Sequence, residues 1–279
     1  MKNEHSEEIL YGERFKFGDN WEKFLKTLNE ERILEAEQSL KDMLSVTDLT
    51  EKRFLDIGSG SGLFSLAAKR LGAKVHSFDY DPQSVRCTKE LKNRYYPNDN
   101  NWIIEEGSAL DEKYLTSLGE FDAVYSWGVL HHTGNMKKAL ENAILPVSNQ
   151  GILFIAIYND QGISSKLWKL IKKTYCSNWP GKIIINMTFI PLFTLLSIAI
   201  GIVKYGNPIG QFTNYKKKKR GMSIYRDWID WLGGYPFEAA KPEDIFNLYK
   251  SHGFVLEKLT TTNGWGCNEF VFRRNTNIT

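Results

Sequence analysis

Three glycines at alternate positions follow an apolar run in the segment Phe54–Ala68, FLDIGSGSGLFSLAA. Gly58, Gly60 and Gly62 permit a turn with unusual backbone angles, and they allow a ligand to lie against main-chain atoms. The dinucleotide fingerprint needs the spacing G-x-G-x-x-G, which places a pyrophosphate on a helix N-terminus. Here Leu63 stands where the third glycine of that fingerprint would be. The spacing therefore favours a nucleoside-like ligand without a pyrophosphate, and a tight turn without a ligand is the alternative.

Carboxylate and small polar residues follow the next two apolar strands. Asp79 comes about twenty residues after the glycines, where a carboxylate accepts hydrogen bonds from both ribose hydroxyls. Asp81 precedes Pro82, and this pair predicts a helix whose first turn is capped by the aspartate. After the third strand, the segment EGSALD offers Ser108 and Ala109 as the lining of an adenine site.

Two adjacent histidines follow the fourth strand in the segment SWGVLHHTGN. Near neutral pH a histidine can accept the proton of a hydroxyl group as a general base, so both are candidate catalytic residues. His132 is slightly ahead of His131 because it stands further from the strand end, and a positioning or structural role is the alternative. Trp127 ends the same strand and is a candidate cofactor contact. Tyr158 and Asn159 end the fifth strand and border the same site.

A second group of aromatic and acidic residues lies in the segment DWIDWLGGYPFE. Asp227, Asp230, Trp231 and Tyr235 place aromatic faces beside carboxylates, which suits a sugar or an aromatic alcohol. These residues are candidates for the acceptor-binding site. The alternative is a packed lid helix whose acidic side chains are solvated.

The elements that must position these residues alternate along the chain. Strands are predicted at 52–58, 73–79, 101–107, 121–127 and 151–159, with helices between them. Such alternation calls for a parallel sheet covered on both faces. A helix at 242–252 precedes two further strands, 254–262 and 267–274, which are close enough in sequence to pair antiparallel. In a sheet of this kind ligands bind beyond the carboxyl ends of the strands, where all the residues above fall.

Four parts of the chain are expected. They are an N-terminal helical cover at 1–50, a ligand-binding core at 51–160, an insertion forming an acceptor lid at 161–240, and a C-terminal helix and strand hairpin at 241–279. In the first part, Tyr11, Phe17 and Trp21 are interpreted as core residues in slight preference to residues that close over the ligand.

Taken together, LDIGSGSG, the acidic end of VHSFDYD, GSALD and FDAVYSWGVLHH resemble a class I S-adenosylmethionine-dependent methyltransferase. Within that superfamily the chain is similar to the ubiquinone-biosynthesis O-methyltransferase type. The resemblance implies a doubly wound, Rossmann-like α/β fold with a seven-stranded sheet whose last strand is antiparallel. It also implies that Asp56 and the three glycines hold the methionine moiety, and that Asp79 holds the ribose. Many relatives carry an acid where this chain has Ser108, so adenine recognition here is expected to use backbone groups.

An apolar run at 183–203 is long enough to span a bilayer, although polar residues and a proline dilute it. A single crossing would separate the last two strands from their sheet, which argues against a span. A hairpin, an interfacial helix or a buried lid helix stays open. Basic residues at Lys216–Arg220 can touch anionic headgroups, so a peripheral membrane contact through 183–220 is one alternative and a solvated loop is the other.

The composition limits the remaining functions. A net charge of +3 is too small to indicate a nucleic-acid partner, and three dispersed cysteines fit a reducing cytoplasm without a disulfide framework or a metal site. The N-terminus is polar and acidic, so a signal peptide is not expected. The leading hypothesis is O-methylation of a small-molecule, glycan or lipid-linked hydroxyl, since IYND lacks the N/D-P-P-Y/F pattern of amide methyltransferases. A quinone-precursor methyltransferase, an NAD-linked oxidoreductase and a non-catalytic binding module are the alternatives.

Overall fold

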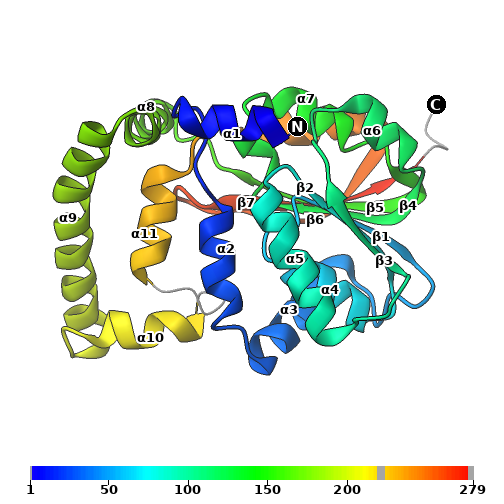
Figure 1. Cartoon of the computed structure of the whole chain (residues 1–279), viewed down its shortest axis with the longest axis horizontal. Coiled ribbons are helices and arrows are strands. Elements are labelled where there is room, and N and C mark those ends of the chain that lie inside the picture. The colour runs from blue at the N-terminus through cyan, green and yellow to red at the C-terminus, as the bar shows by residue number, and fades with distance from the viewer. Residues whose placement is uncertain (1, 219–223, 276–279) are drawn as a thin grey trace.

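A seven-stranded sheet organises the chain, with the strand order β3-β2-β1-β4-β5-β7-β6 (Figure 1). The computed structural model describes residues 2–218 and 224–275. The strands are β1 (Arg53–Ile57), β2 (Lys74–Asp79), β3 (Trp102–Glu106), β4 (Phe121–Trp127), β5 (Val147–Tyr158), β6 (Phe254–Thr260) and β7 (Cys267–Arg274). Strand β7 runs antiparallel to both of its neighbours, and the other pairings are parallel. The predicted doubly wound sheet with an antiparallel last strand is confirmed.

Helices cover both faces of this sheet. Three precede it: α1 (Lys2–Leu10), α2 (Gly18–Leu25) and α3 (Glu30–Leu44). The others outside the insertion are α4 (Leu63–Arg70), α5 (Pro82–Tyr95), α6 (Glu112–Ser117), a 3-10 turn η1 (Leu130–His132), α7 (Met136–Asn142) and α12 (Pro242–Ser251). The predicted cap of α5 is confirmed, because the Asp81 side chain accepts a hydrogen bond from the Gln83 amide at 2.8 Å.

Alternating side chains of the strands divide the core into two layers. On β5, Phe154 belongs to the cluster beneath α2 to α5, whereas Leu153 and Ile155 belong to the cluster beneath α6, α7 and α12. All three side chains are buried. A central strand buried on both faces explains why its sequence is a continuous apolar run.

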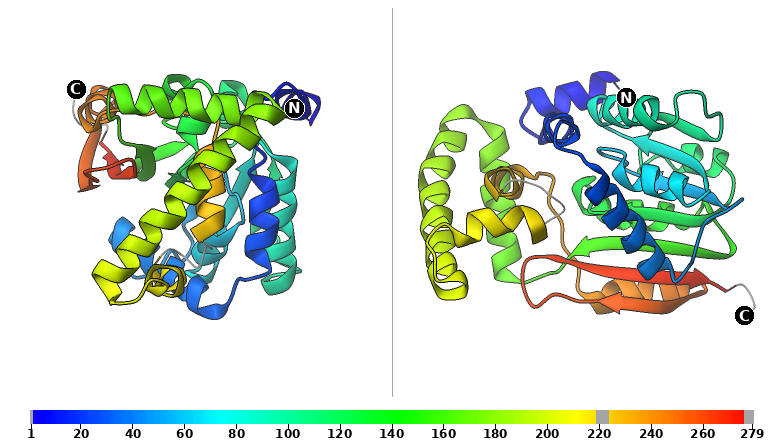
Figure 2. Two further views of the ribbon diagram at one scale, coloured as in Figure 1. Left: turned by 90° about the vertical axis from the view of Figure 1, so that its left-hand side faces the viewer. Right: turned by 90° about the horizontal axis from the view of Figure 1, so that it is seen from below.

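The described part of the insertion contains four helices, which stand beside the sheet (Figures 1 and 2). They are α8 (Ile163–Ser177), α9 (Trp179–Tyr205), α10 (Gly210–Lys218) and α11 (Ile224–Gly233). Its two ends meet at a narrow neck, where the Ala240 amide donates to the Tyr158 carbonyl at 3.0 Å and the Asp160 amide donates to the Ala240 carbonyl at 3.1 Å. The insertion therefore leaves and rejoins the sheet domain at one place.

Candidate active site

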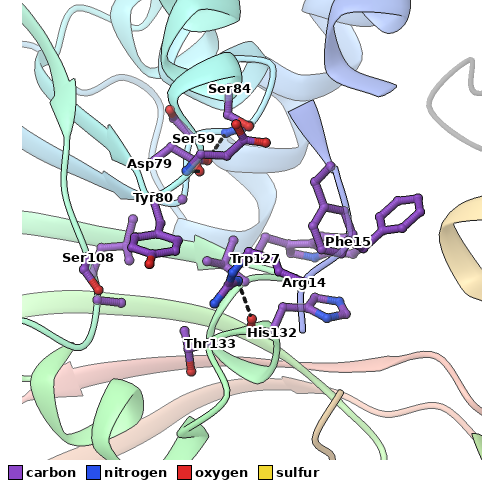
Figure 3. Close-up of a pocket in the computed structure, with 18 of the residues that line it drawn as sticks. Arg14, Phe15, Ser59, Asp79, Tyr80, Ser84, Ser108, Trp127, His132 and Thr133 are labelled. Atoms are coloured by element: carbon purple, nitrogen blue, oxygen red, sulfur yellow. Dashed lines mark hydrogen bonds between the residues drawn. The ribbon is translucent and has the colours of Figure 1, made fainter. Parts of the chain in front are cut away.

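A pocket of about 1540 Å³ lies at the carboxyl ends of the central strands. The glycine loop, the end of β2, the segment after β3 and the loop after β4 all line it, and the N-terminal segment and α11 complete its walls. The topology therefore unites motifs that are far apart in the sequence. Figure 3 shows residues from these segments facing one cavity.

The glycine loop owes its shape mainly to contacts within the protein. Gly58, Gly60 and Gly62 have φ angles of 79°, 55° and 80°, a region that favours glycine. A Cβ on Gly58 would lie 2.4 Å from Val129, and one on Gly62 would lie 2.9 Å from Thr88 of α5. Gly58 and Gly60 line the pocket, and Gly62 is absent from its wall.

The structure therefore corrects the assignment of Gly62 to ligand binding. A glycine is needed at position 62 because α5 packs closely against the start of α4. The three alternating glycines therefore do not share one cause, since Gly58 and Gly60 line the pocket and Gly62 does not. Gly60 differs again, because a Cβ there would lie 3.0 Å from the indole of Trp21.

Two carboxylates lie under this loop. Asp79 accepts hydrogen bonds from the amides of Gly60 and Asp81, both at 2.9 Å, and burial raises the pKa of Asp79 to about 6. Asp56 is fully buried at the end of β1 and accepts a hydrogen bond from the Ser65 hydroxyl. Burial, with a smaller contribution from the negative charge of Asp79, raises the pKa of Asp56 to about 7. Both carboxylates line the pocket, which places acceptors where a ribose and a cationic amine can bind.

Ser108 and Ala109, the residues predicted to lie beside an adenine, line the pocket. The Ser108 hydroxyl accepts a hydrogen bond from the Leu110 amide at 3.2 Å, and the Asn142 side chain donates to the Ala109 carbonyl at 2.9 Å. Tyr80 faces the same space from the end of β2 (Figure 3). These interactions hold the main chain of this segment in place beside the cavity.

Trp127 lines the middle of the pocket, and its indole donates to the Glu269 carboxylate of β7 at 2.7 Å. This bond fixes the ring where β4 ends. The antiparallel last strand thus supports the pocket wall.

The two histidines have different environments. His132 lines the pocket, and its Nδ1–H donates a hydrogen bond to the Pro236 carbonyl at 2.6 Å. Its Nε2 therefore carries the lone pair that an acceptor hydroxyl would need. Burial lowers the pKa of His132 to about 3, so the imidazole is neutral at physiological pH. This pKa lies well below the range near neutrality in which a general base works best.

His131 is completely buried and outside the pocket wall. Its Nδ1 accepts a hydrogen bond from the Tyr158 amide at 3.3 Å, and its ring lies 4.1 Å from the Tyr158 ring. Burial lowers the pKa of His131 well below its usual value. The arrangement gives His131 a packing role beneath the loop.

The N-terminal segment closes one side of the pocket. Arg14 donates to the His132 carbonyl at 3.0 Å and lies 4.8 Å from the ring of Tyr80 (Figure 3). The ring of Phe17 lies 4.9 Å from that of His132, and Trp21 covers Gly60. Sequence reasoning missed Arg14.

The preference for core positions also needs correction. Tyr11 is 70% exposed, and Tyr11, Phe17 and Trp21 all line the pocket. Trp21 additionally packs against the core cluster. The signal available in the sequence was the clustering of aromatic and basic residues in ERFKFGDNW, a segment too short and irregular to be core alone.

The opposite wall belongs to the insertion and to the turn between β6 and β7. Tyr158, Asp227, Asp230 and Trp231 line the pocket as predicted, and the turn adds Trp265. The Asn20 side chain donates to the Asp230 carboxylate, and the Tyr215 hydroxyl donates to the Asp227 carboxylate. Because Asn20 belongs to α2, the N-terminal cover and the insertion meet over the pocket.

Two predicted acceptor contacts are not in the pocket wall. The side-chain nitrogen of Asn159 donates to the Thr262 carbonyl at 3.0 Å, and its side-chain oxygen accepts from the side chain of Asn268. Asn159 therefore organises the turn between β6 and β7. The Tyr235 carbonyl accepts from the Phe15 amide at 2.8 Å, which ties the N-terminal segment to the insertion. Both are structural residues here. Among the described residues, no group of three or more His, Cys, Asp or Glu side chains could hold a metal ion.

A family model described as a methyltransferase domain matches residues 26–199, more than half of the chain. The chain belongs to this methyltransferase family. The matched residues include the glycine loop, both carboxylates, the adenine segment and the histidines. This membership selects a class I S-adenosylmethionine-dependent methyltransferase over the oxidoreductase and the non-catalytic module, and S-adenosylmethionine is its cofactor.

Individual relatives are similar over parts of this methyltransferase. A ribosomal protein L11 methyltransferase of Prochlorococcus marinus is 34% identical over 114 residues, 40% of this chain and 37% of the relative. A ubiquinone biosynthesis O-methyltransferase of Parvibaculum lavamentivorans is 26% identical over 144 residues, 50% of this chain and 52% of the relative. The chain thus spans about half or less of these curated relatives. The magnesium protoporphyrin IX methyltransferase of Synechocystis shares the fold, with a TM-score of 0.51 and 13% identity over 87% of this chain and 83% of its own.

The pocket fits the cofactor of this methyltransferase family. Asp79 at the end of β2 suits the ribose, the Gly58–Gly60 loop suits the methionine moiety, and Ser108 and Ala109 suit the adenine. The buried carboxylate of Asp56 can balance a cationic amine. Each of these groups already faces the cavity.

Proposed function

We propose that this methyltransferase acts on a hydroxyl group of a small-molecule, glycan or lipid-linked acceptor. The observation that carries the proposal is the fixed tautomer of His132, whose protonated Nδ1 bonds to Pro236 and whose Nε2 is left as a base at the pocket wall. A hydroxyl acceptor benefits from such a base, because it loses a proton as it is methylated.

When bound, S-adenosylmethionine supplies an activated methyl group. The chain then has to hold the acceptor in line, take up one proton and exclude water. His132 Nε2 takes the proton, and Arg14 holds the main chain of the same turn. Phe17 and Trp21 shield the cavity from solvent on the N-terminal side.

Aromatic and acidic side chains at the insertion end suit a polyhydroxylated or aromatic acceptor. The rings of Tyr158 and Trp231 are 5.7 Å apart and nearly perpendicular, and those of Trp231 and Trp265 stack at 6.2 Å. The carboxylates of Asp227 and Asp230 can accept hydrogen bonds from sugar hydroxyls. A quinone precursor is the second candidate, supported by the likeness to ubiquinone biosynthesis O-methyltransferases.

Acidic residues at the pocket argue against a nucleic-acid acceptor. Besides Asp227 and Asp230, the wall includes Glu4, Glu7, Glu8 and Glu13 of the N-terminal segment. Carboxylates repel a phosphodiester backbone, whose binding depends on neutralisation by lysine and arginine. A neutral or weakly charged acceptor is consistent with this wall.

The test is transfer of a carbon-13 methyl group from labelled S-adenosylmethionine to lipid-linked sugars, free glycans, catechol-type quinone precursors and amine controls. Nuclear magnetic resonance of the product distinguishes an O-methyl group from an N-methyl group by its chemical shift. An O-methyl product that depends on His132 and is unaffected by His252→Gln supports the proposal, because His252 is exposed and remote from the pocket. Exclusive N-methylation would contradict it.

A further inference from the structure

Helix α9 is apolar around most of its circumference, yet it lies at the edge of the molecule (Figure 1). Among the described residues it is one helix that is long and apolar enough to cross a membrane. Its inward side is a row at every fourth position with a partly buried row beside it. The first row is Gly181, Ile185, Phe189, Phe193, Ser197 and Gly201, and the second is Asn186, Ile190, Thr194 and Ile198. These residues are buried or partly buried, so the two rows fix α9 to its neighbours.

The remaining sides of α9 present large apolar side chains to solvent. Met187 is 74% exposed, Leu195 is 65% exposed and Val203 is 88% exposed. Helix α8, which packs beside α9, also exposes large apolar side chains at Ile163, Leu167 and Leu170. Exposed apolar surface of this extent on a folded protein marks an interaction site. We call the exposed apolar and basic residues of these two helices the α8–α9 face.

Charge identifies what this face binds. Residues 161–226 contain 12 of the chain's 36 lysines and arginines and none of its 33 acidic residues, and Lys172 among them is buried and does not belong to the face. On α8, the exposed residues Lys166, Lys169 and Lys173 alternate with the exposed apolar ones. The basic run at 216–220 lies outside the described side chains. An apolar surface surrounded by one sign of charge complements an interface that is itself apolar inside and negatively charged outside.

We propose that the α8–α9 face docks on the surface of an anionic lipid bilayer, with α9 lying in the plane of the headgroups. A second copy of this chain is a poor occupant, because pairing two such faces would bring two sets of like charges together. The lipid surface instead satisfies both the apolar side chains and the lysines.

The arrangement of the insertion explains why α9 lies on the membrane instead of crossing it. At about 1.5 Å per residue its 27 residues extend roughly 40 Å, enough to span. However, its ends join α8 and α10, and α8 and α11 both pack beside it on the side of the sheet (Figures 1 and 2). Insertion across a bilayer would tear these contacts apart, whereas docking preserves them.

Docking also places the pocket near the lipid. Helix α11 contributes Asp230 and Trp231 to the pocket wall, and Trp231 packs against Trp168 of α8 at 5.2 Å between ring centres. One helix layer therefore separates the face from the acceptor end. The docking itself does not rest on the identity of the acceptor.

The test is co-sedimentation of the full chain with vesicles of neutral phosphatidylcholine alone or mixed with anionic phosphatidylglycerol. Two triple variants remove the two components of the face. The first is Met187→Gln, Leu195→Gln and Val203→Gln, and the second is Lys166→Gln, Lys169→Gln and Lys173→Gln. Matched controls change exposed residues elsewhere, namely Leu34→Gln, Ile103→Gln and Val255→Gln for the apolar set, and Lys89→Gln, Lys137→Gln and Lys250→Gln for the basic set.

The parent should bind the anionic vesicles, and each variant of the face should lower the partition coefficient about tenfold or more while the controls do not. Added salt should weaken binding of the parent. Calorimetry with S-adenosylhomocysteine should give parental affinity in every variant, which shows that the fold and the cofactor site are intact. Two results would overturn the proposal: a parent that stays in the supernatant with anionic vesicles, or an apolar variant that still binds them as the parent does.

Discussion

At the scale of single residues, the pocket keeps two carboxylates in places that disfavour their charged forms. Asp56 and Asp79 lose solvation by burial, which raises the pKa of Asp56 to about 7 and of Asp79 to about 6. A ligand that donates hydrogen bonds or carries positive charge stabilises the charged carboxylates in place of the water that burial removed. The free energy of cofactor binding should therefore depend on these two groups.

Asp79→Asn should weaken binding of S-adenosylhomocysteine by about 2–3 kcal/mol, the scale of lost charge-assisted hydrogen bonds. The asparagine retains the shape of the side chain but cannot accept at both oxygens. Isothermal titration calorimetry at pH 8 measures the loss, and circular dichroism checks the fold. Parental affinity in a folded variant would remove the ribose assignment.

Cofactor affinity should also depend on pH. Asp79 must be ionised to accept two hydrogen bonds, so its contribution to the affinity should be complete above about pH 7 and should be lost as the pH decreases through about 6. The carboxylate of Asp56, whose pKa is about 7, should add a further fall centred about one pH unit higher. Binding isotherms between pH 8 and pH 5.5 give the profile. In Asp79→Asn the part of this fall that is due to Asp79 should vanish, and an unchanged profile would assign the titration to other groups.

His132→Gln should lower turnover by on the order of 10², the low end of the usual contribution of a general base, because a base with a pKa of about 3 accepts a proton weakly. Cofactor affinity should stay nearly unchanged. Since the pKa of His132 is about 3, its protonation should not limit the rate above about pH 5. Steady-state turnover with an identified acceptor measures both effects. A variant with parental turnover would shift the role of base to a carboxylate of the insertion, such as Asp227 or Asp230.

At the scale of elements, the glycine loop joins β1 to α4 against two different neighbours. Gly62→Ala should destabilise the fold by about 1–3 kcal/mol, because φ is 80° there and a Cβ would lie 2.9 Å from Thr88. Gly60→Ala should chiefly displace Trp21, since a Cβ would lie 3.0 Å from its indole.

Urea unfolding and calorimetry on the two glycine variants separate these effects. Gly62→Ala should lose stability with little change in cofactor affinity per folded molecule, whereas Gly60→Ala should lose affinity more than stability. The reverse pattern would show that Gly62 contacts the cofactor and that Trp21 does not cover the loop.

Regular elements could be predicted from the sequence because their signals are local. Apolar segments alternating with predicted helices located all seven strands, and Asp81-Pro82 located the start of α5. The family resemblance implied seven strands with an antiparallel last one, and the order of the strands is known from the structure. The end of β5 at Tyr158 and the segment after β3 were placed correctly at the pocket because parallel strands end at one edge of a sheet.

Contacts between distant segments could not be predicted in this way. Nothing near Arg14 in the sequence indicates that it bonds to the His132 carbonyl, 118 residues away. Likewise, the difference between His131 and His132 arises from the position of Pro236 and Tyr158 around them. Asn159 and Tyr235 were misplaced because polar residues beside a pocket look the same in sequence whether they face the ligand or support the wall.

At the scale of the whole molecule, one buried lysine connects two helices of the insertion, α8 and α11. Lys172 of α8 donates to the Trp231 carbonyl of α11, and its ammonium lies 4.2 Å from the Trp231 ring and 4.9 Å from the Phe237 ring. Burial lowers the pKa of Lys172 to about 7, whereas its usual value is 10.5. Between these values the unfolded chain binds one more proton than the folded one, so Lys172 makes stability rise with pH.

Lys172→Met should therefore flatten the dependence of the unfolding free energy on pH between about 7 and 10. The unfolding free energy of the parent should rise by about 1–3 kcal/mol more than that of the variant between pH 7 and pH 9. Urea unfolding at several pH values gives both curves. Identical slopes would mean that Lys172 keeps its proton in the folded protein.

The narrow neck at Tyr158, Asp160 and Ala240 has a consequence for how such a chain can change. Because β5 and the segment before α12 are already bonded to each other there, the closure of the sheet does not depend on what lies between them. The length and sequence of the insertion can therefore change without altering the strand order. A replacement would also have to restore the bonds that Asp230, Tyr235 and Pro236 make to the N-terminal segment and to His132, so the coupling between the insertion and the pocket limits which changes are tolerated.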